Sequence, residues 1–276
     1  MILVTRALAR AALAAALSAP AAGQTPSPAP IPIQDNSFLL EEAYNQEAGV
    51  VQTIQEFARV VGTGDWVYSL TQEWPVPDEK NQLSATIQFL GLSGPGGFSR
   101  GLGDVQLNYR YQLVGNGEAP VAVAPRLTLI IPSGNSKRGL GAGGFGIQVG
   151  LPLSIVLSNS FVSNSNLGGT VLFSAKNTAG ATSNLWSASA GQGLIWLAHP
   201  NVNPLVEAVV ATNEVFGADG SPVRRTEATV SPGIRGAINL PGHLQFVPGF
   251  AVPLGVGPSH GKTAIFAYFS VELPVF

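Results

Sequence analysis

The sequence of 276 residues contains no cysteine, so a disulfide and a thiolate metal site are both excluded. Charge is also scarce, because only 11% of the residues are charged, against about a quarter in a typical soluble protein. The formal net charge of -2 argues against nucleic acid as a partner. No run of about 18 apolar residues occurs beyond the N-terminus, which excludes a helical membrane span. Hydrophobic residues nevertheless make up 45% of the chain, so we expect much apolar surface that does not face water.

Residues 1–23 are predicted to be a secretory signal peptide. Arg6 and Arg10 precede the apolar run 11–17, and small residues then offer a cleavage site near Ala21. The apolar run is too short for an uncleaved anchor, so cleavage is favoured. A secreted chain without cysteine fits a bacterial envelope.

From Val50 onward the chain alternates between apolar and polar residues. Val105, Leu107 and Tyr109 share one row of the stretch 103–113, and Asn108 lies in the other row. Because side chains of a strand point alternately to its two faces, this pattern predicts a strand with one apolar and one polar face. The predicted strands are residues 50–59, 65–75, 83–92, 103–114, 120–132, 145–156, 160–173, 186–198, 204–214, 225–238, 242–254 and 263–276.

Strand length and connection length favour a membrane barrel over a soluble core. The predicted strands have about ten residues, as a tilted membrane strand needs, whereas soluble strands have about five or six. Turns on the side of the termini are short and most connections on the other side are longer, which is typical of outer-membrane barrels. In hydrocarbon every backbone hydrogen bond must be made within the protein, so no edge can stay open. The sequence therefore predicts an all-β fold over residues 50–276: a closed antiparallel transmembrane β-barrel of about 12 strands in the bacterial outer membrane.

Several aromatic and proline positions bear on this barrel. Aromatic residues near strand ends fit the membrane–water boundary, although ordinary strand propensity also explains them. Five prolines would each remove a ladder hydrogen bond, so we expect them at bulges or near strand ends. They are Pro125, Pro152, Pro232, Pro248 and Pro253.

Residues 24–49 are predicted to form a proline-rich linker and a short N-terminal periplasmic segment. The part from Asp35 onward favours a short helix, because its apolar residues fit one helical face. The adjacent Glu41 and Glu42 do not face each other on a helix, so a solvated face is favoured over acid–base chemistry. Whether this segment plugs the barrel or lies beneath it stays open at this point.

Several stretches resemble the outer-membrane transporter-like family that is named for the MetA pathway of phenol degradation. The resemblance implies a barrel that passes small, aromatic or hydrophobic molecules. The final Phe276 resembles the terminal aromatic signal that the barrel insertion machinery reads, although it falls on the face opposite to Val275. The stretches are Asn36–Glu47 (NSFLLEEAYNQE) with Gly49–Gln52, Trp66–Pro75, Gly101–Asp104, Asn108–Tyr111, Pro125–Leu127 before Pro132–Gly134, Val247–Gly249 and Gly255–Ser259.

Motifs that suggest cofactor or catalytic chemistry lack the required context. Residues 139–144 match a dinucleotide-binding glycine pattern and residues 257–261 match a nucleophile elbow, yet neither precedes a predicted helix. Both stretches are therefore predicted to be loops. Lys137 and Arg138, beside the first stretch, are interpreted as a solvated pair in preference to a lipopolysaccharide contact. The three histidines are too scattered for a metal site. We expect no cofactor, no metal and no enzymatic activity.

The inward rows of the barrel carry polar residues and charges of both signs. These charges either pair across the lumen and seal it, or line a polar pathway and set its selectivity. The first case gives a structural or binding barrel and the second a channel for small molecules; a lipid hydrolase in the barrel is least favoured. Expected partners are outer-membrane lipid and lipopolysaccharide, the insertion machinery through Phe276 and a small solute, for a chain that acts as a monomer. The candidate lumen-lining residues are Glu73, Asp104, Asn108, Arg110, Arg126, Glu227, Arg235 and His243.

Overall fold

The computed structural model describes residues 33, 35–94, 96–117, 119–241 and 244–275. The predicted signal peptide lies outside the described residues, as do His243 and Phe276. In the described part of the chain, no helix is long and apolar enough to cross a membrane.

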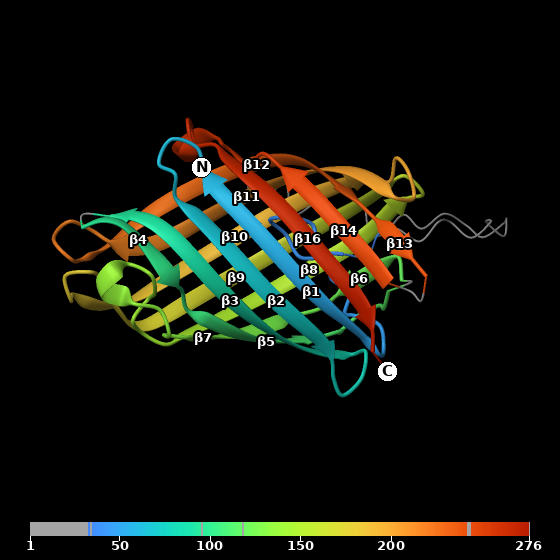
Figure 1. Cartoon of the computed structure of the whole chain (residues 1–276), viewed down its shortest axis with the longest axis horizontal. Helices are drawn as coiled ribbons and strands as arrows, with labels where there is room; N and C mark the ends of the chain where they lie inside the picture. Colours follow the sequence, from blue (N-terminus) through green and yellow to red (C-terminus); the bar gives the residue numbers. More distant parts are fainter. Residues whose placement is uncertain (1–32, 34, 95, 118, 242–243, 276) are drawn as a thin grey trace, which may run out of the picture. The chain divides into compact units, whose positions relative to one another are not determined.

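The described chain from Val50 onward forms a closed antiparallel β-barrel of 12 strands, as the sequence predicts (Figure 1). Closure joins β16 to β1 along their whole length and joins β12 to β14 and β15. Some of the 12 barrel strands are broken into two segments. The segments are β1 (Val50–Val60), β2 (Trp66–Pro75), β3 (Asn81–Gly94), β4 (Gly97–Leu102), β5 (Val105–Tyr111), β6 (Val121–Val123), β7 (Arg126–Ile131), β8 (Gly146–Ser158), β9 (Phe161–Lys176), β10 (Thr182–Trp196), β11 (Val202–Phe216), β12 (Pro222–Gly236), β13 (Ile238–Leu240), β14 (Leu244–Ala251), β15 (Leu254–Gly255) and β16 (Ala264–Pro274), with short 3₁₀ helices η1 (Ser136–Arg138) and η2 (Gly257–Ser259).

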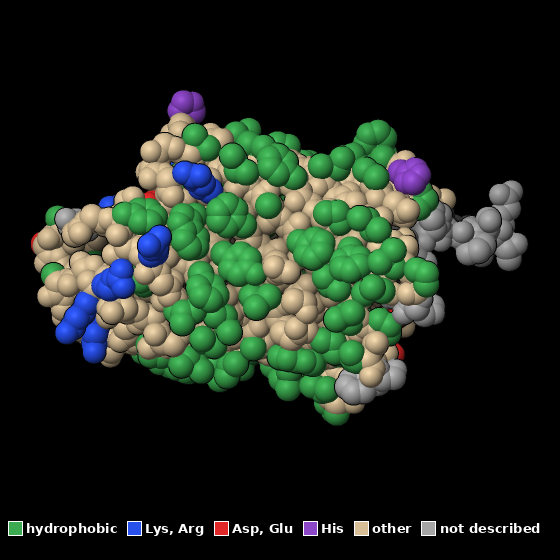
Figure 2. All heavy atoms as spheres, in the orientation of Figure 1, with side chains coloured by type: hydrophobic (Ala, Val, Ile, Leu, Met, Phe, Trp, Pro, Cys, Tyr) green, Lys and Arg blue, Asp and Glu red, His purple; other side chains and the backbone are tan. Residues whose placement is uncertain are grey.

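The barrel is apolar outside and polar inside. On β5, Leu107 and Tyr109 are 43% and 41% exposed, whereas Asn108 and Arg110 are only 5% and 4% exposed. Hydrophobic side chains accordingly cover much of the visible outer wall in Figure 2. Water would not favour such a surface, whereas lipid does, and the strand ladder closes around the barrel, as a chain in hydrocarbon requires. The fold is therefore that of a β-barrel built to sit in a membrane.

The five strand prolines lie at interruptions of the hydrogen-bond ladder. Pro125 separates β6 from β7, and Pro253 separates β14 from β15. Pro152 lies on β8 where its neighbour changes from β7 to β6. Pro232 lies on β12 where the neighbour changes from β14 to β15, and Pro248 lies just beyond the last β12–β14 pair. A missing N–H therefore falls where the ladder is broken on one side anyway.

The connections away from the termini are shorter than predicted. The turn between β9 and β10 is residues 177–181 instead of 174–185, and that between β11 and β12 is residues 217–221 instead of 215–224. A hairpin of β3 and β4 replaces most of the predicted loop 93–102. The strands stay paired beyond the point where apolar and polar residues stop alternating, so the alternation does not indicate where these strands end. Residues 132–145 remain a long loop, which contains η1.

The N-terminal segment lies inside the barrel and is not the predicted helix. Its residues form bends and turns, and many of its backbone N–H groups bind side chains of the wall. Those donors are therefore unavailable for a helical ladder, which explains why no helix forms. We call residues 33 and 35–48 the plug. The sequence left open whether this segment plugs the barrel or lies beneath it. In the structure it lies within the lumen.

Candidate functional site

The plug is fixed to the barrel by three buried charged side chains of the wall, of which Glu207 on β11 is the first. Its carboxylate accepts hydrogen bonds from the backbone N–H groups of Phe38, Leu39 and Leu40 at 3.0–3.1 Å. Glu207 is 1% exposed, so these bonds replace its contacts with water. Three converging donors make the same type of anion site that a helix N-terminus provides. Glu207 therefore sets the path of the plug at its tip.

Arg235 on β12 binds the start of the plug. One terminal nitrogen, Nη1, donates to the carbonyl of Asp35 at 2.6 Å and to Oε1 of Glu42 at 2.7 Å. The other, Nη2, donates to the carbonyl of Ile33 at 2.6 Å. Glu42 is itself buried, so the expectation of a solvated face is wrong for this residue. Its burial is possible because the wall supplies the opposite charge.

Arg110 on β5 binds the end of the plug. Its Nη2 atom donates to the carbonyl of Tyr44 at 2.6 Å, and its Nε atom donates to Oδ1 of Asn45 at 2.9 Å. Arg126 on β7 forms an ion pair with Glu41, 2.5 Å from Nη1 to Oε1. The guanidinium groups thus pair with the plug and not with acids of the opposite wall.

Asp35 supplies a fourth anchor from the plug side. Its carboxylate accepts hydrogen bonds from the hydroxyls of Tyr268 and Ser270 on β16, and from Nε2 of Gln52 on β1 at 2.8 Å. All four residues are at least 97% buried. Tyr268 therefore points into the barrel and is no part of an aromatic belt, although its sequence position near a strand end fits one.

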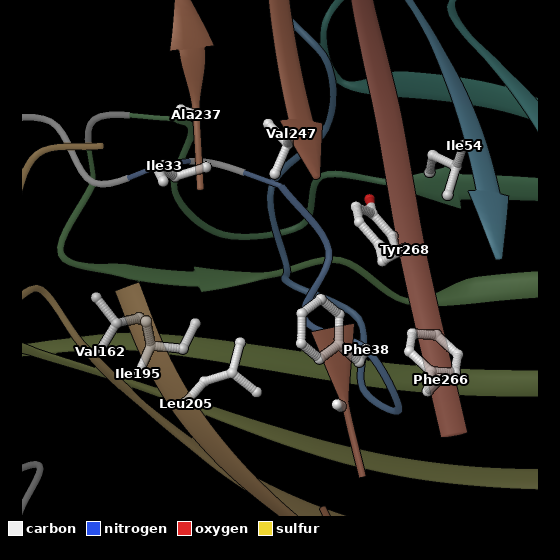
Figure 3. Close-up of a cluster of buried hydrophobic side chains, with 11 residues drawn as sticks. Ile33, Phe38, Ile54, Val162, Ile195, Leu205, Ala237, Val247, Phe266 and Tyr268 are labelled. Atoms are coloured by element: carbon white, nitrogen blue, oxygen red, sulfur yellow. The ribbon is translucent and has the colours of Figure 1, made fainter. Parts of the chain in front are cut away.

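Glycines of the wall make room for two apolar side chains of the plug. A Cβ atom on Gly249 would lie 2.4 Å from the Phe38 ring, and one on Gly233 would lie 2.6 Å from it. A Cβ on Gly191 would lie 2.3 Å from Leu40. Figure 3 shows the Phe38 ring close to Phe266 of β16, with ring centroids 5.5 Å apart. The wall is thus shaped to the plug at these glycines.

This fit predicts that Gly249→Ala displaces Phe38, because the added methyl would overlap its ring, and overpacking costs about 1–3 kcal/mol. Since the chain has no cysteine, Ala43→Cys gives a plug reporter whose parent side chain is fully buried. Gly249→Ala should speed maleimide labelling of this reporter. Gly150→Ala is the matched control, because its Cβ would meet nothing closer than 3.9 Å. Equal labelling in both variants would contradict the fit.

Two cavities lie on either side of the plug. The larger, about 900 Å³, opens at the end of the barrel with the short turns, beside residues 200–201 and 239–240. The smaller, about 350 Å³, lies between the plug and the wall of β1, β2, β3, β5 and β7. Asn36, Glu73 and Arg110 line both cavities. The lumen is therefore filled unevenly: the larger cavity borders β13, β14 and β16 as well as β1, β2 and β5, and the smaller borders β1, β2, β3, β5 and β7.

The structure brings together four of the candidate residues around the smaller cavity: Glu73, Asn108, Arg110 and Arg126. Glu73 accepts a hydrogen bond from Nε2 of Gln82 at 2.8 Å. Asn108 donates to Ser84 at 3.0 Å and accepts from Thr128 at 2.7 Å. Such bonds between side chains of the wall hold the polar lining in place.

The remaining candidates lie elsewhere. Arg235 anchors the plug as described. Asp104, between β4 and β5, accepts hydrogen bonds from the backbone N–H groups of Gly134 and Ala142 at 2.9 and 2.7 Å and so orders the loop 132–145. Glu227 forms an exposed ion pair with Lys262, at 2.7 Å.

The candidate residues from the sequence did not include Asp35, Glu42, Glu56 or Glu207, which the structure places in the interior. The alternation of β1 places Glu56 in the inward row with Gln52 and Ile54, so this signal was present. Asp35 and Glu42 precede the first strand and carry no such signal.

The motifs set aside from the sequence have structural explanations. Ser259, within the nucleophile-elbow match, is buried, and its Oγ accepts a hydrogen bond from the backbone N–H of Ala228 at 3.1 Å. Residues 139–144 lie in the loop that Asp104 orders. Among the described residues, no group of three or more acidic or histidine side chains is arranged to hold a metal ion.

A closed 12-stranded barrel with a polar, partly filled lumen defines the protein as a β-barrel of the outer-membrane type. Two solved structures share this fold. The COG4313 outer membrane channel from Pseudomonas putida F1 has a TM-score of 0.58 and 13% identity, over 83% of this chain and 98% of that one. The NanC porin has a TM-score of 0.53 and 8% identity, over 79% of this chain and 98% of that one.

No protein-family model matches the chain, and no curated protein matches its sequence. The resemblance to the family named for the MetA pathway therefore stays a prediction. The two structural likenesses agree with it at the level of the fold.

Proposed function

We propose that the protein is an outer-membrane channel that lets small polar solutes pass between the plug and the barrel wall. The observation that carries this proposal is the pair of cavities on either side of the plug, whose walls share Asn36, Glu73 and Arg110. A sealed barrel would not need cavities on the two sides of its plug. The channel and porin nature of the two structural neighbours supports the same class of function.

The proposed route follows β1, β2, β3 and β5. We infer that its narrow point lies where the two cavities share their lining, at Asn36 of the plug and at Glu73 and Arg110 of the wall. Glu207 and the wall glycines attach the plug tip to β10, β11, β12 and β14, and residues 38–40 of this tip line the smaller cavity on the route. Solute therefore passes beside the plug along this part of the wall, where Arg110 both anchors the plug and borders the route.

Acidic groups outnumber basic groups along this route, even though Glu41 pairs with Arg126 and Glu42 with Arg235. Fixed charges of one sign in a narrow lumen favour solutes of the opposite sign. We infer a preference for small polar or cationic solutes. The hydroxyl and amide groups of the lining fit these better than the aromatic or hydrophobic molecules that the family resemblance implies. The charged groups around the two cavities are Asp35, Glu41, Glu42, Glu47, Glu56, Glu73 and Glu272, with Arg110 and Arg126.

Single-channel recording in planar bilayers tests this function. We expect ion current through the purified protein and a reversal potential in a salt gradient that favours cations. Glu73→Gln should reduce that preference, because it removes a charge at the narrow point.

Glu227→Gln is the matched control, since Glu227 is exposed, paired with Lys262 and absent from both cavity walls. Absence of current above background would support the sealed structural barrel instead. A selectivity that Glu73→Gln and Glu227→Gln change equally would rule out the proposed narrow point.

A further inference from the structure

A row of outward-facing residues crosses four neighbouring strands near the loop end of the barrel. Arg59 on β1 lies opposite Trp66 on β2, Trp66 lies opposite Gly91 on β3, and Gly91 lies opposite Arg100 on β4. A Cβ atom on Gly91 would lie 2.1 Å from Nε1 of Trp66, so the glycine is what lets the indole lie flat between the two arginines. The row therefore places two cations on the outer wall, on either side of an aromatic ring.

These cations have no acidic partner among the described residues. The ion pairs found there involve Arg110, Arg126, Arg235 and Lys262, and none involves Arg59 or Arg100. Asp65, in the turn after β1, is engaged by Ser93, whose hydrogen bonds to the carboxylate hold the pKa of Asp65 below its usual range. An unpaired arginine on a lipid-facing wall is unfavourable unless it lies near the boundary and finds an anion there.

The surface around Arg59 is grooved and apolar. A groove of about 540 Å³ is lined by Phe57, Arg59, Thr63, Gly64, Trp66 and Phe98, and a second of about 450 Å³ lies on the other side of Arg59, towards Ile265. Phe57 and Trp66 pack with ring centroids 6.3 Å apart. A guanidinium between two apolar grooves offers an anion contact with space for hydrocarbon on both sides.

Basic side chains continue from this row along the same end of the barrel. Lys137 and Arg138 of η1 are exposed. In Figure 2, Lys and Arg side chains gather over this end, above β4 and η1, and few acidic side chains appear between them. Because the short turns lie at the opposite end, this end faces the outer leaflet in a barrel of this type.

We propose that Arg59, Trp66 and Arg100 form a binding site for a phosphorylated lipid of the outer leaflet. Each guanidinium donates hydrogen bonds to a phosphate of the headgroup, and the acyl chains lie in the grooves beside Phe57 and Phe98. Arginine suits this role, because its planar group binds phosphate with two parallel hydrogen bonds. Lys137 and Arg138 add long-range attraction for the same headgroup.

Native mass spectrometry of the full detergent-purified barrel tests the site, with lipid A bearing two phosphates as the probe. We expect the parent protein to retain the lipid, and Arg59→Gln with Arg100→Gln to weaken binding about tenfold or more. Dephosphorylated lipid A should bind the parent protein as weakly as the phosphorylated lipid binds the double variant. On a gel, the unheated sample of each variant should migrate faster than the boiled sample, which confirms that the variant is folded.

Lys262→Gln is the matched control, because Lys262 is an exposed cation at the same end that already pairs with Glu227. It should bind lipid A as the parent does. Equal retention by the parent and the double variant would overturn the site, and so would equal retention of the lipid with and without its phosphates. Neither result bears on ion conduction, so the site and the channel are tested separately.

Discussion

Replacing Arg235 with alanine is expected to free the plug from the barrel wall and leave the barrel closed. The change removes the guanidinium that binds the Asp35 and Ile33 carbonyls, and it leaves Glu42 buried without its charge partner. Removing one partner of a buried ion pair costs about 3–5 kcal/mol. The plug avoids this cost by leaving its position, because no plug contact takes part in the strand ladder that closes the barrel.

Maleimide labelling of the Ala43→Cys reporter measures the release. We expect rapid labelling in Arg235→Ala and slow labelling in the parent, together with a larger single-channel conductance as the lumen empties. Arg224→Ala is the control, since Arg224 lies over the ring of Trp186 on β10, 4.4 Å from its centroid, and this contact is part of the barrel wall. Parent-like labelling and conductance in Arg235→Ala would show that the remaining anchors suffice.

Replacing Leu107 with arginine is expected to impair assembly of the barrel. Leu107 lies at the centre of β5, faces outward and pairs with Ala85 on β3 and Leu129 on β7, whose side chains face the same way. An arginine on the lipid face costs about 2–4 kcal/mol near the middle of the membrane and about 0–1 kcal/mol near its boundary. The yield of folded barrel in lipid vesicles should fall accordingly, as judged by the mobility of unheated samples on gels.

Leu102→Arg is the control, because it makes the same substitution at a different position on the outer wall. Leu102 is also outward and exposed, but it ends β4 near the loop end of the barrel. It should fold almost as well as the parent protein. Equal losses for Leu102→Arg and Leu107→Arg would mean that the outer wall at β5 does not sit in the hydrocarbon.

The strands were predictable because their signal is local. Alternation along β5 or β8 reflects two environments that every second residue meets, and it can be read without knowing the neighbouring strands. The signal failed at the ends of β9 to β12, where the apolar alternation stops before the pairing does. It also failed at Pro125 and Pro253, which divide predicted continuous strands at interruptions of the ladder.

The candidate site was predictable only in part. Their place in the inward-facing row of a strand identified Glu73, Asn108, Arg110, Arg126 and Arg235 as polar residues of the interior. This place alone did not distinguish them from Asp104, which orders a loop, or from Glu227, which is exposed beside Lys262. Their roles depend on which segment passes close by, and that is set by tertiary structure.

By itself, the sequence determined a closed barrel with an apolar exterior, because hydrocarbon leaves a β chain no other way to pair its backbone. It did not determine the place or form of residues 35–48. Glu42 meets Arg235 across 193 residues of sequence, and Phe38 meets Glu207 across 169. Only closure of the barrel brings these wall residues together around the plug. The buried ion pairs, the glycines fitted to Phe38 and Leu40 and the two cavities beside the plug were therefore decided by the tertiary structure alone.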